Sequence, residues 1–221
     1  MHLLEGVLSG DELALIRQVL ELAAFEDGKL TASGLAAAAK QNLQLKREGA
    51  EAETLDRTIV GALSRHPILR AAALPKRFVA PLYSRYEPGM QYAAHVDAAL
   101  MGPEGETRSD LSITIFLNEP NAYDGGELAI QTAGGVREVK LPAGSAVMYS
   151  TYAVHEVKPV TRGQRLVAVT WIESRVRDPL MREVLFDLHA VNHSLGEKQA
   201  TSLEARLLNK AVINLLRLVS E

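Results

Sequence analysis

Hydrophobic positions in the first third of the chain recur at helical spacing. Over about residues 9–25, apolar side chains fall three or four positions apart, and either Ser9 or Asp11 can cap the first turn. A second helix is predicted over about residues 50–65, and it must stop before Pro67 because proline disfavours a helical residue before it. Between them lie a turn-rich link at 28–34 and an alanine run at 36–40, for which a short helix and a lining of small residues are both open.

Between residues 78 and 172 the pattern changes to short apolar runs separated by turn signals. Strands are predicted over residues 78–86, 111–117, 127–130, 137–141, 145–150 and 165–172. The turn signals are Pro88-Gly89, Gly102-Pro103, Asp124-Gly125, Gly134-Gly135, Pro142-Ala143-Gly144 and Arg162-Gly163. Asp124-Gly125 and Gly134-Gly135 are interpreted as hairpin turns. Regular short strands with such punctuation predict an antiparallel barrel or jelly roll.

After Arg177 the helical pattern returns and continues to the end of the chain. Two apolar stripes stand out, one at residues 180, 184, 185 and 188 and the other at residues 203, 207, 208, 212, 215 and 216. The second stripe must bury against something, either the protein's own barrel or a second copy in a homodimer. The chain is therefore predicted to be α+β with a mainly β core, divided into N-terminal helical support (1–75), a β core (76–174) and a C-terminal helical extension (175–221).

Composition narrows the class of protein. The chain has 221 residues, 47% of them hydrophobic and 23% charged, as in ordinary globular proteins. A net charge of −3 gives no electrostatic case for binding nucleic acid. The absence of Cys excludes disulfides, thiolate zinc sites, iron–sulfur clusters and a Cys nucleophile. No apolar run reaches membrane-spanning length and the start lacks the pattern of a signal peptide, so a cytoplasmic location is expected.

The pair His95-Val96-Asp97, followed by His155, is the main candidate for chemistry. Side chains two apart on an extended strand point to the same face, so His95 and Asp97 can reach one metal ion, with His155 returning on a facing strand. Two imidazoles and one carboxylate on one side of a metal leave the opposite positions open, which suits non-haem Fe(II). Such a pair alone is weak, since a lone His is more often a surface or core residue than a ligand.

The other histidines carry less weight. His189 and His193 are four residues apart on a predicted helix, but no HExxH pattern accompanies them, so they are interpreted as surface or interface residues. Arg165, ten residues beyond His155, could supply a planar cationic fork for a carboxylate. Arg162 lies close by, but positions three apart on a strand point to opposite faces, so only one of the two should face a pocket.

A wider set of motifs resembles the bacterial PKHD-type hydroxylases, in the prolyl-4-hydroxylase-like branch of the Fe(II)/2-oxoglutarate dioxygenases. The matching runs begin at Ser84-Arg85-Tyr86 and His95-Val96-Asp97 and continue through Asp110-Leu111-Ser112, Phe116-Leu117, Tyr123 to Leu128, Leu141 to Gly144, His155, Pro159 to Gly163 and Trp171-Ile172. The resemblance implies a double-stranded β-helix, with iron at His95, Asp97 and His155. It selects Arg165 over Arg162 for 2-oxoglutarate and makes Tyr86 a candidate to assist, although Tyr86 is equally interpretable as a core aromatic residue.

The resemblance also implies O₂ and an unidentified small-molecule or peptide substrate, and makes L-ascorbate a further candidate cofactor. Some relatives are associated with iron uptake and siderophore handling. The alternative is a metal-binding jelly roll without redox turnover, such as a sensor or a zinc hydrolase, or an interaction protein built on the C-terminal helices. Arg165 favours the oxygenase, because a hydrolase has no need of that cation. Glu127 is expected at a solvated strand end rather than at the pocket mouth, and Trp171 in the core.

Overall fold

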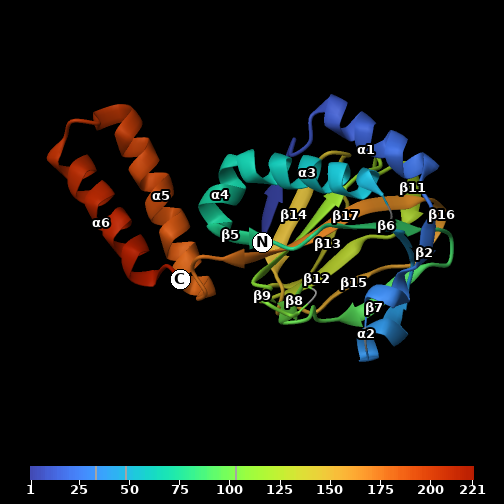
Figure 1. The fold of residues 1–221 in the computed structure, drawn as a ribbon. Coiled ribbons are helices and arrows are strands. Elements are labelled where there is room, and N and C mark those ends of the chain that lie inside the picture. Colours follow the sequence, from blue (N-terminus) through green and yellow to red (C-terminus); the bar gives the residue numbers. More distant parts are fainter. Residues whose placement is uncertain (33, 48, 103) are drawn as a thin grey trace.

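The computed structural model describes residues 1–32, 34–47, 49–102 and 104–221. Ser33 in the predicted 28–34 link and Pro103 in the predicted Gly102-Pro103 turn lie outside the described residues. The main body consists of two facing antiparallel sheets with helices on one outer face, and a helical hairpin follows at the C-terminus (Figure 1). The predicted α+β class with a mainly β core is confirmed.

The larger sheet forms one wall of the body. Its strands run in the order β1 (His2–Leu4), β14 (Ala146–Ser150), β10 (Leu111–Phe116), β17 (Arg165–Ser174), β6 (Leu82–Tyr86), β4 (Leu43–Leu45) and β2 (Phe25–Asp27), with β5 (Pro75–Phe78) also paired to β17. The second sheet has the order β13 (Gly135–Val139), β12 (Leu128–Thr132), β15 (His155–Val157), β7 (Gln91–His95) and β3 (Lys40–Gln41). Two short pairs complete the strands, β11 (Tyr123–Gly125) with β16 (Val160–Gly163) and β8 (Leu100–Met101) with β9 (Thr107–Arg108).

Helices cover the outer face of the larger sheet. They are α1 (Gly10–Leu22), α3 (Ala50–Arg65) and α4 (Pro67–Ala73), while the 3₁₀ helix η1 (Gly28–Thr31) and α2 (Gly34–Ala39) lie near β3. Ser9 caps α1 by accepting a hydrogen bond from the Glu12 amide, and Glu12 Oε2 accepts one from the Ser9 amide in return. The predicted helices at 9–25 and 50–65 are confirmed, although α1 ends three residues early because Phe25 begins β2.

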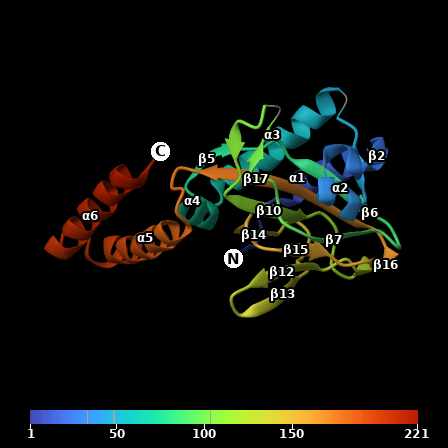
Figure 2. The same ribbon diagram turned by 90° about the horizontal axis from the view of Figure 1, so that it is seen from below.

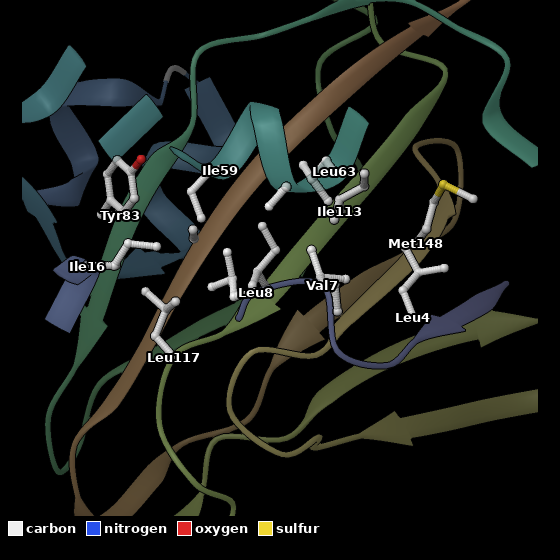
Figure 3. Close-up of a cluster of buried hydrophobic side chains, with 14 of the residues drawn as sticks. Leu4, Val7, Leu8, Ile16, Ile59, Leu63, Tyr83, Ile113, Leu117 and Met148 are labelled. Atoms are coloured by element: carbon white, nitrogen blue, oxygen red, sulfur yellow. The ribbon is translucent and has the colours of Figure 1, made fainter. Parts of the chain in front are cut away.

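The central strands are apolar on one face and mixed on the other. On β10, Leu111, Ile113 and Ile115 pack against the helices, as Figure 3 shows for part of this cluster. Ser112 and Thr114 alternate with them and face the space between the sheets, where they line a cavity. Both faces of the strand are buried, the polar face as well as the apolar one. The period of two on β10 thus separates an apolar core under the helices from the cavity between the sheets.

Two predicted chain features are wrong. Residues 78–86 do not form one strand, because the chain leaves β17 after Phe78 and rejoins it at Leu82. Phe78 pairs with Ile172 and Leu82 pairs with Val169. The first chain therefore advances four residues while β17 advances three, and the extra residue makes the segment around Pro81 bulge out. Asp124-Gly125 is not a hairpin turn, since it belongs to β11 and pairs with β16. The hairpin at Gly134-Gly135 is confirmed between β12 and β13.

The N-terminal third contributes strands as well as helices. The pieces β1, β2, β3 and β4 are two or three residues long, too short for a periodic pattern, and the sequence did not predict them. The alanine run forms α2, which settles its conformation as helical. Helix α4, which begins with Pro67 in its first turn, was also not predicted. The three-part division of the chain stays a prediction.

The C-terminal helices α5 (Pro179–Gln199) and α6 (Leu203–Val219) pack against each other and extend away from the sheets (Figures 1 and 2). Asp178 and Ser202 cap their first turns through hydrogen bonds to the amides of Met181 and Ala205. The hairpin meets the body mainly at α4 and through an edge contact between the rings of Phe186 and His2. It therefore does not cover the β core.

Candidate metal centre and co-substrate cavity

A cavity of about 570 Å³ lies between the two sheets. Its walls include all five residues singled out from the sequence, namely Tyr86, His95, Asp97, His155 and Arg165. They come from β6, β7, the loop after β7, β15 and β17, so the fold brings together residues up to 79 positions apart in the chain.

A bulge in β7 aims His95 at the cavity. His95 pairs with His155 and Tyr92 pairs with Val157, so three steps on β7 oppose two on β15. The extra residue turns Tyr92 and His95 to the same face, although their odd spacing would place them on opposite faces of a regular strand. Their rings stack with centroids 3.6 Å apart. Asp97 lies just beyond the end of β7, as expected for a strand or its frayed end.

The side chains of His95, Asp97 and His155 present three ligand atoms to one point. These atoms lie within 4.8 Å of one another. Asp97 Oδ1 is 3.9 Å from His95 Nε2 and 3.7 Å from His155 Nε2. Each histidine donates from Nδ1 to a backbone carbonyl, His95 to Ala93 at 2.8 Å and His155 to Ala153 at 3.0 Å. That bond fixes the tautomer and leaves the Nε2 lone pair free for a metal.

Trp171 orients the carboxylate of this group. Its indole Nε1 donates a hydrogen bond to Asp97 Oδ2 at 2.9 Å. Trp171 was expected in the core, but its side chain lines the cavity and contacts a candidate ligand. The sequence carried one signal for this role: Trp171 lies six residues after Arg165 on the same strand, an even spacing that places both on one face.

Electrostatics keep His95 in its neutral form. Burial, with a smaller effect of the facing His155, lowers the pKa of His95 to about 4. A neutral imidazole is the form that binds a metal, so no proton must be displaced at neutral pH. The residues present therefore fit a divalent ion, which two nitrogens and one oxygen would hold. This donor set is typical of non-haem Fe(II).

Arg165 is the most deeply buried cation of the site. Its side chain is 1% exposed and pairs across the sheet with Tyr86, whose ring centroid lies 5.0 Å from the guanidinium carbon. No carboxylate in the described part of the chain forms an ion pair with it, and its Nε lacks a hydrogen bond of normal geometry. A buried cation without a counter-charge is costly, so the site is suited to a carboxylate ligand. Burial raises the pKa of Tyr86, which keeps its phenol protonated and able to donate.

Arg162, Glu127 and the histidines of the C-terminal helix lie outside the cavity. Arg162 donates two hydrogen bonds to the exposed carboxylate of Asp124, at 2.6 and 3.0 Å. Of the two arginines, the structure places only Arg165 at the cavity, the one that the family resemblance selected. The predicted reason, alternation along one strand, is wrong, because Arg162 lies on β16 and Arg165 on β17. Glu127 lies 3.9 Å from Lys140 at the edge of the sheet and does not line the cavity. His189 and His193 lie on α5, where His193 faces Glu197 at 3.6 Å.

The sequence did not predict one wall of the cavity. Lys40, Asn42 and Gln44 line it, and all three are at most 5% exposed. They alternate along a segment that runs from β3 to β4. Polar residues at alternate positions were the available signal, but the segment was too short to separate from a loop.

Comparisons with known proteins agree with this geometry. A model of the 2OG-Fe(II) oxygenase superfamily matches residues 81–173. A PKHD-type hydroxylase of Thermosynechococcus vestitus is 46% identical over 97% of this chain and 96% of its own length. A PKHD-type hydroxylase of Rippkaea orientalis is 46% identical over 96% of this chain and 95% of its own. The chain belongs to the family of PKHD-type hydroxylases. It is accordingly a 2-oxoglutarate- and Fe(II)-dependent dioxygenase, an oxidoreductase.

Solved structures support the same fold for this PKHD-type hydroxylase. A viral collagen prolyl hydroxylase from Paramecium bursaria Chlorella virus-1, solved as a 2OG complex, matches with a TM-score of 0.55 and 18% identity over 78% of this chain and 94% of its own. A prolyl hydroxylase from Trichoplax adhaerens matches with a TM-score of 0.56 and 17% identity over 77% of this chain and 82% of its own. At these identities the likeness shows the jelly-roll fold. Among the described residues, no helix has the length and apolar character needed to cross a membrane.

Proposed function

We propose that His95, Asp97 and His155 hold Fe(II) and that Arg165, assisted by Tyr86, binds the far carboxylate of 2-oxoglutarate. The observation that carries this assignment is the meeting of the three ligand atoms and the unpaired Arg165 in one cavity. A dianionic co-substrate can satisfy the metal at one end and the guanidinium at the other.

The protein's own groups supply orientation and shielding. The Nδ1 bonds to Ala93 and Ala153 hold both imidazole rings, and the Trp171 indole holds the carboxylate. Arg165 and the protonated Tyr86 phenol orient the co-substrate, while Phe116, whose ring centroid is 5.7 Å from the guanidinium carbon, helps keep water from the ion pair. When bound, Fe(II) and 2-oxoglutarate supply O₂ activation coupled to oxidative decarboxylation, which yields succinate and CO₂ and hydroxylates the substrate.

The test is anaerobic addition of Fe(II) and then 2-oxoglutarate to the purified protein. A metal-to-ligand charge-transfer band should appear for the wild type and be absent from His95→Ala, Asp97→Ala and His155→Ala, with circular dichroism unchanged. Release of succinate on admitting O₂ would then separate the oxygenase from a non-redox metal sensor. Full metal binding by Asp97→Ala would remove that residue from the centre.

The primary substrate is a small molecule or a peptide; a prolyl hydroxylase among the solved structures is bound to a peptide fragment. A link to iron or siderophore metabolism, and use of L-ascorbate, rest on the family resemblance alone. A cytoplasmic location rests on composition. A homodimer through α5 and α6 rests on the apolar side chains that this hairpin leaves exposed, among them Leu180, Leu203 and Leu207.

A further inference from the structure

Residues 40–45, which form β3, β4 and the link between them, cross from one sheet to the other and line one side of the cavity. Lys40 pairs with Tyr92 in the smaller sheet, and Gln44 pairs with Ser84 in the larger one. Because the backbone between them is extended, Lys40, Asn42 and Gln44 direct their side chains to the same side. That side faces the cavity, so the three side chains form the part of its wall that lies between the two sheets.

Lys40 brings a second buried cation into this cavity. Its side chain is 5% exposed, and its ammonium donates one described hydrogen bond, to Thr31 Oγ1 at 2.9 Å. The ammonium also lies 5.5 Å from the centroid of the Tyr92 ring, which stacks on His95. Lys40 is therefore separated from a candidate metal ligand by a single aromatic ring.

Neighbouring side chains hold Lys40 in place without neutralising it. Thr31 Oγ1 donates to Gln44 Oε1 at 2.5 Å, which turns its lone pairs toward the ammonium. Among the described residues, no carboxylate oxygen lies close enough to the Lys40 ammonium to form an ion pair with it. Burial lowers the pKa of Lys40 to about 8, against the opposing effects of Asp97 and Asp27, so the ammonium remains mostly protonated at neutral pH. The Asn42 amide is buried as well, but its neighbours are the Tyr86 phenol and the backbone of Gly28 rather than the ammonium.

The charges in the cavity, with metal and co-substrate bound, leave one positive charge without a partner. The charged side chains among the described lining residues are Lys40, Asp97 and Arg165. A divalent metal, the Asp97 carboxylate, the two carboxylates of 2-oxoglutarate and Arg165 sum to zero. The positive charge of Lys40 is left over, and a buried charge without a partner is unfavourable.

We propose that Lys40 binds a carboxylate of the primary substrate, so that the enzyme acts on an organic acid. This inference rests on the proposed function, because the count assumes the metal and the dianionic co-substrate. The single ring between Lys40 and His95 places such a carboxylate close to the reacting centre. Neutral substrates would leave the ammonium unpaired and should be disfavoured.

The experiment uses the protein loaded with Mn(II) and saturating 2-oxoglutarate, which binds without turnover. The readout is the fluorescence of Trp171, the only tryptophan in the sequence, which lines the same cavity. N-acetylglycine and its amide, N-acetylglycinamide, serve as a matched acid and neutral probe. We expect saturable binding of the acid at least tenfold tighter than that of the amide. Lys40→Met should abolish the preference, Lys40→Arg should retain part of it, and Lys29→Met, an exposed lysine on η1, should leave it unchanged.

Three results would overturn the assignment. Equal affinity for acid and amide, or no saturable binding of the acid, would show that Lys40 is not an acid-binding group. A rise in the dissociation constant for 2-oxoglutarate in Lys40→Met as large as that in Arg165→Lys would assign Lys40 to the co-substrate instead. Binding of 2-oxoglutarate to the wild type is measured first. Its failure would refute the proposed function and the charge count with it, whereas normal binding followed by indifference to the acid refutes the Lys40 subsite alone.

Discussion

Trp171 Nε1 donates its hydrogen bond to Asp97 Oδ2, the oxygen that faces away from the two histidines. The two oxygens of Asp97 thus have different neighbours, because Oδ1 is the atom that lies 3.7 Å from His155 Nε2. One oxygen of the carboxylate is thus held by the larger sheet, and the other is free for a metal. The bond also ties the loop after β7 to β17, which joins the two sheets at the metal centre.

Replacement of Trp171 by Phe should weaken metal binding. The ring remains to fill the cavity wall, but the carboxylate loses the donor that orients it, and loss of such a partner typically costs 10- to 100-fold in affinity. Titration of the metal-free protein with Mn(II) measures the effect. Metal affinity equal to that of the wild type would show that the indole only packs against Asp97.

Arg165→Lys should raise the KM for 2-oxoglutarate much more than Arg162→Lys does. Lysine keeps the charge but loses the planar fork, and a lost charge-assisted bond is worth roughly 1–3 kcal/mol, or about 5- to 150-fold. Arg162 is a matched control because it bonds the exposed Asp124 rather than the cavity. Steady-state kinetics of succinate release give both values. The reverse ranking of the two variants would contradict the assignment of the co-substrate anchor.

Gly126→Ala should displace Arg165. Gly126 has φ +66°, and an added Cβ would lie 3.0 Å from Arg165 Cδ and 2.9 Å from Val160 Cγ2. Backbone strain and crowding should together lower stability by about 1–3 kcal/mol and raise the dissociation constant for 2-oxoglutarate. Urea denaturation and charge-transfer titration measure the two effects. Gly134→Ala is the control, since its Cβ would meet only Thr132 Oγ1 at 3.9 Å, and a similar response in both variants would show that the crowding is not specific to Arg165.

The central strands were predicted mainly from runs of short apolar segments bounded by turn residues. The strands at 111–117, 145–150 and 165–172 are long and apolar, and each was located to within two residues at either end. Alternation predicted that only one of Arg162 and Arg165 would face the cavity, and the family resemblance selected Arg165. The structure separates the two arginines in another way, because Arg162 lies on β16 and Arg165 begins β17.

What failed depends on contacts that are remote in the chain. The bulge in β7 is visible only against its partner β15, and Lys40 reaches the cavity only because β3 and β4 join different sheets. Trp171 was assigned to the core from its residue type and its place on a strand. Its hydrogen bond to Asp97 could not be predicted, because Asp97 is 74 positions away in the chain. Pairing of such short strands follows from tertiary packing rather than from propensity.

The α5–α6 hairpin should mediate a homodimer. Leu180 is 67% exposed, Leu203 59% and Leu207 53%, although the helices are amphipathic and the stripes need a partner. Light scattering at increasing protein concentration should give twice the mass of the 24.0 kDa chain. Removal of the residues after Arg177 should yield a monomer or an insoluble product. A full-length protein that stays monomeric at high concentration would refute the dimer.

Lys40→Met should make the protein more stable near neutral pH while it removes the proposed acid-binding group. Burial lowers the pKa of Lys40 from 10.5 to about 8, so between these values the unfolded chain holds a proton that the folded chain has lost. Stability of the wild type should therefore rise with pH through this window, whereas the variant lacks this contribution. A shift of that size corresponds to roughly 3 kcal/mol, from which the lost bond to Thr31 subtracts about 1 kcal/mol.

The variant should thus exceed the wild type by about 2 kcal/mol at pH 7.5, and the advantage should disappear by about pH 10.5, where the bond to Thr31 favours the wild type. Urea denaturation at the two pH values measures the difference, and Lys29→Met should show no such dependence because Lys29 is exposed. A group retained for binding at a cost in stability behaves in this way. If Lys40→Met were instead less stable at pH 7.5, the ammonium would be a structural element of the wall, and its burial would need no ligand to explain it.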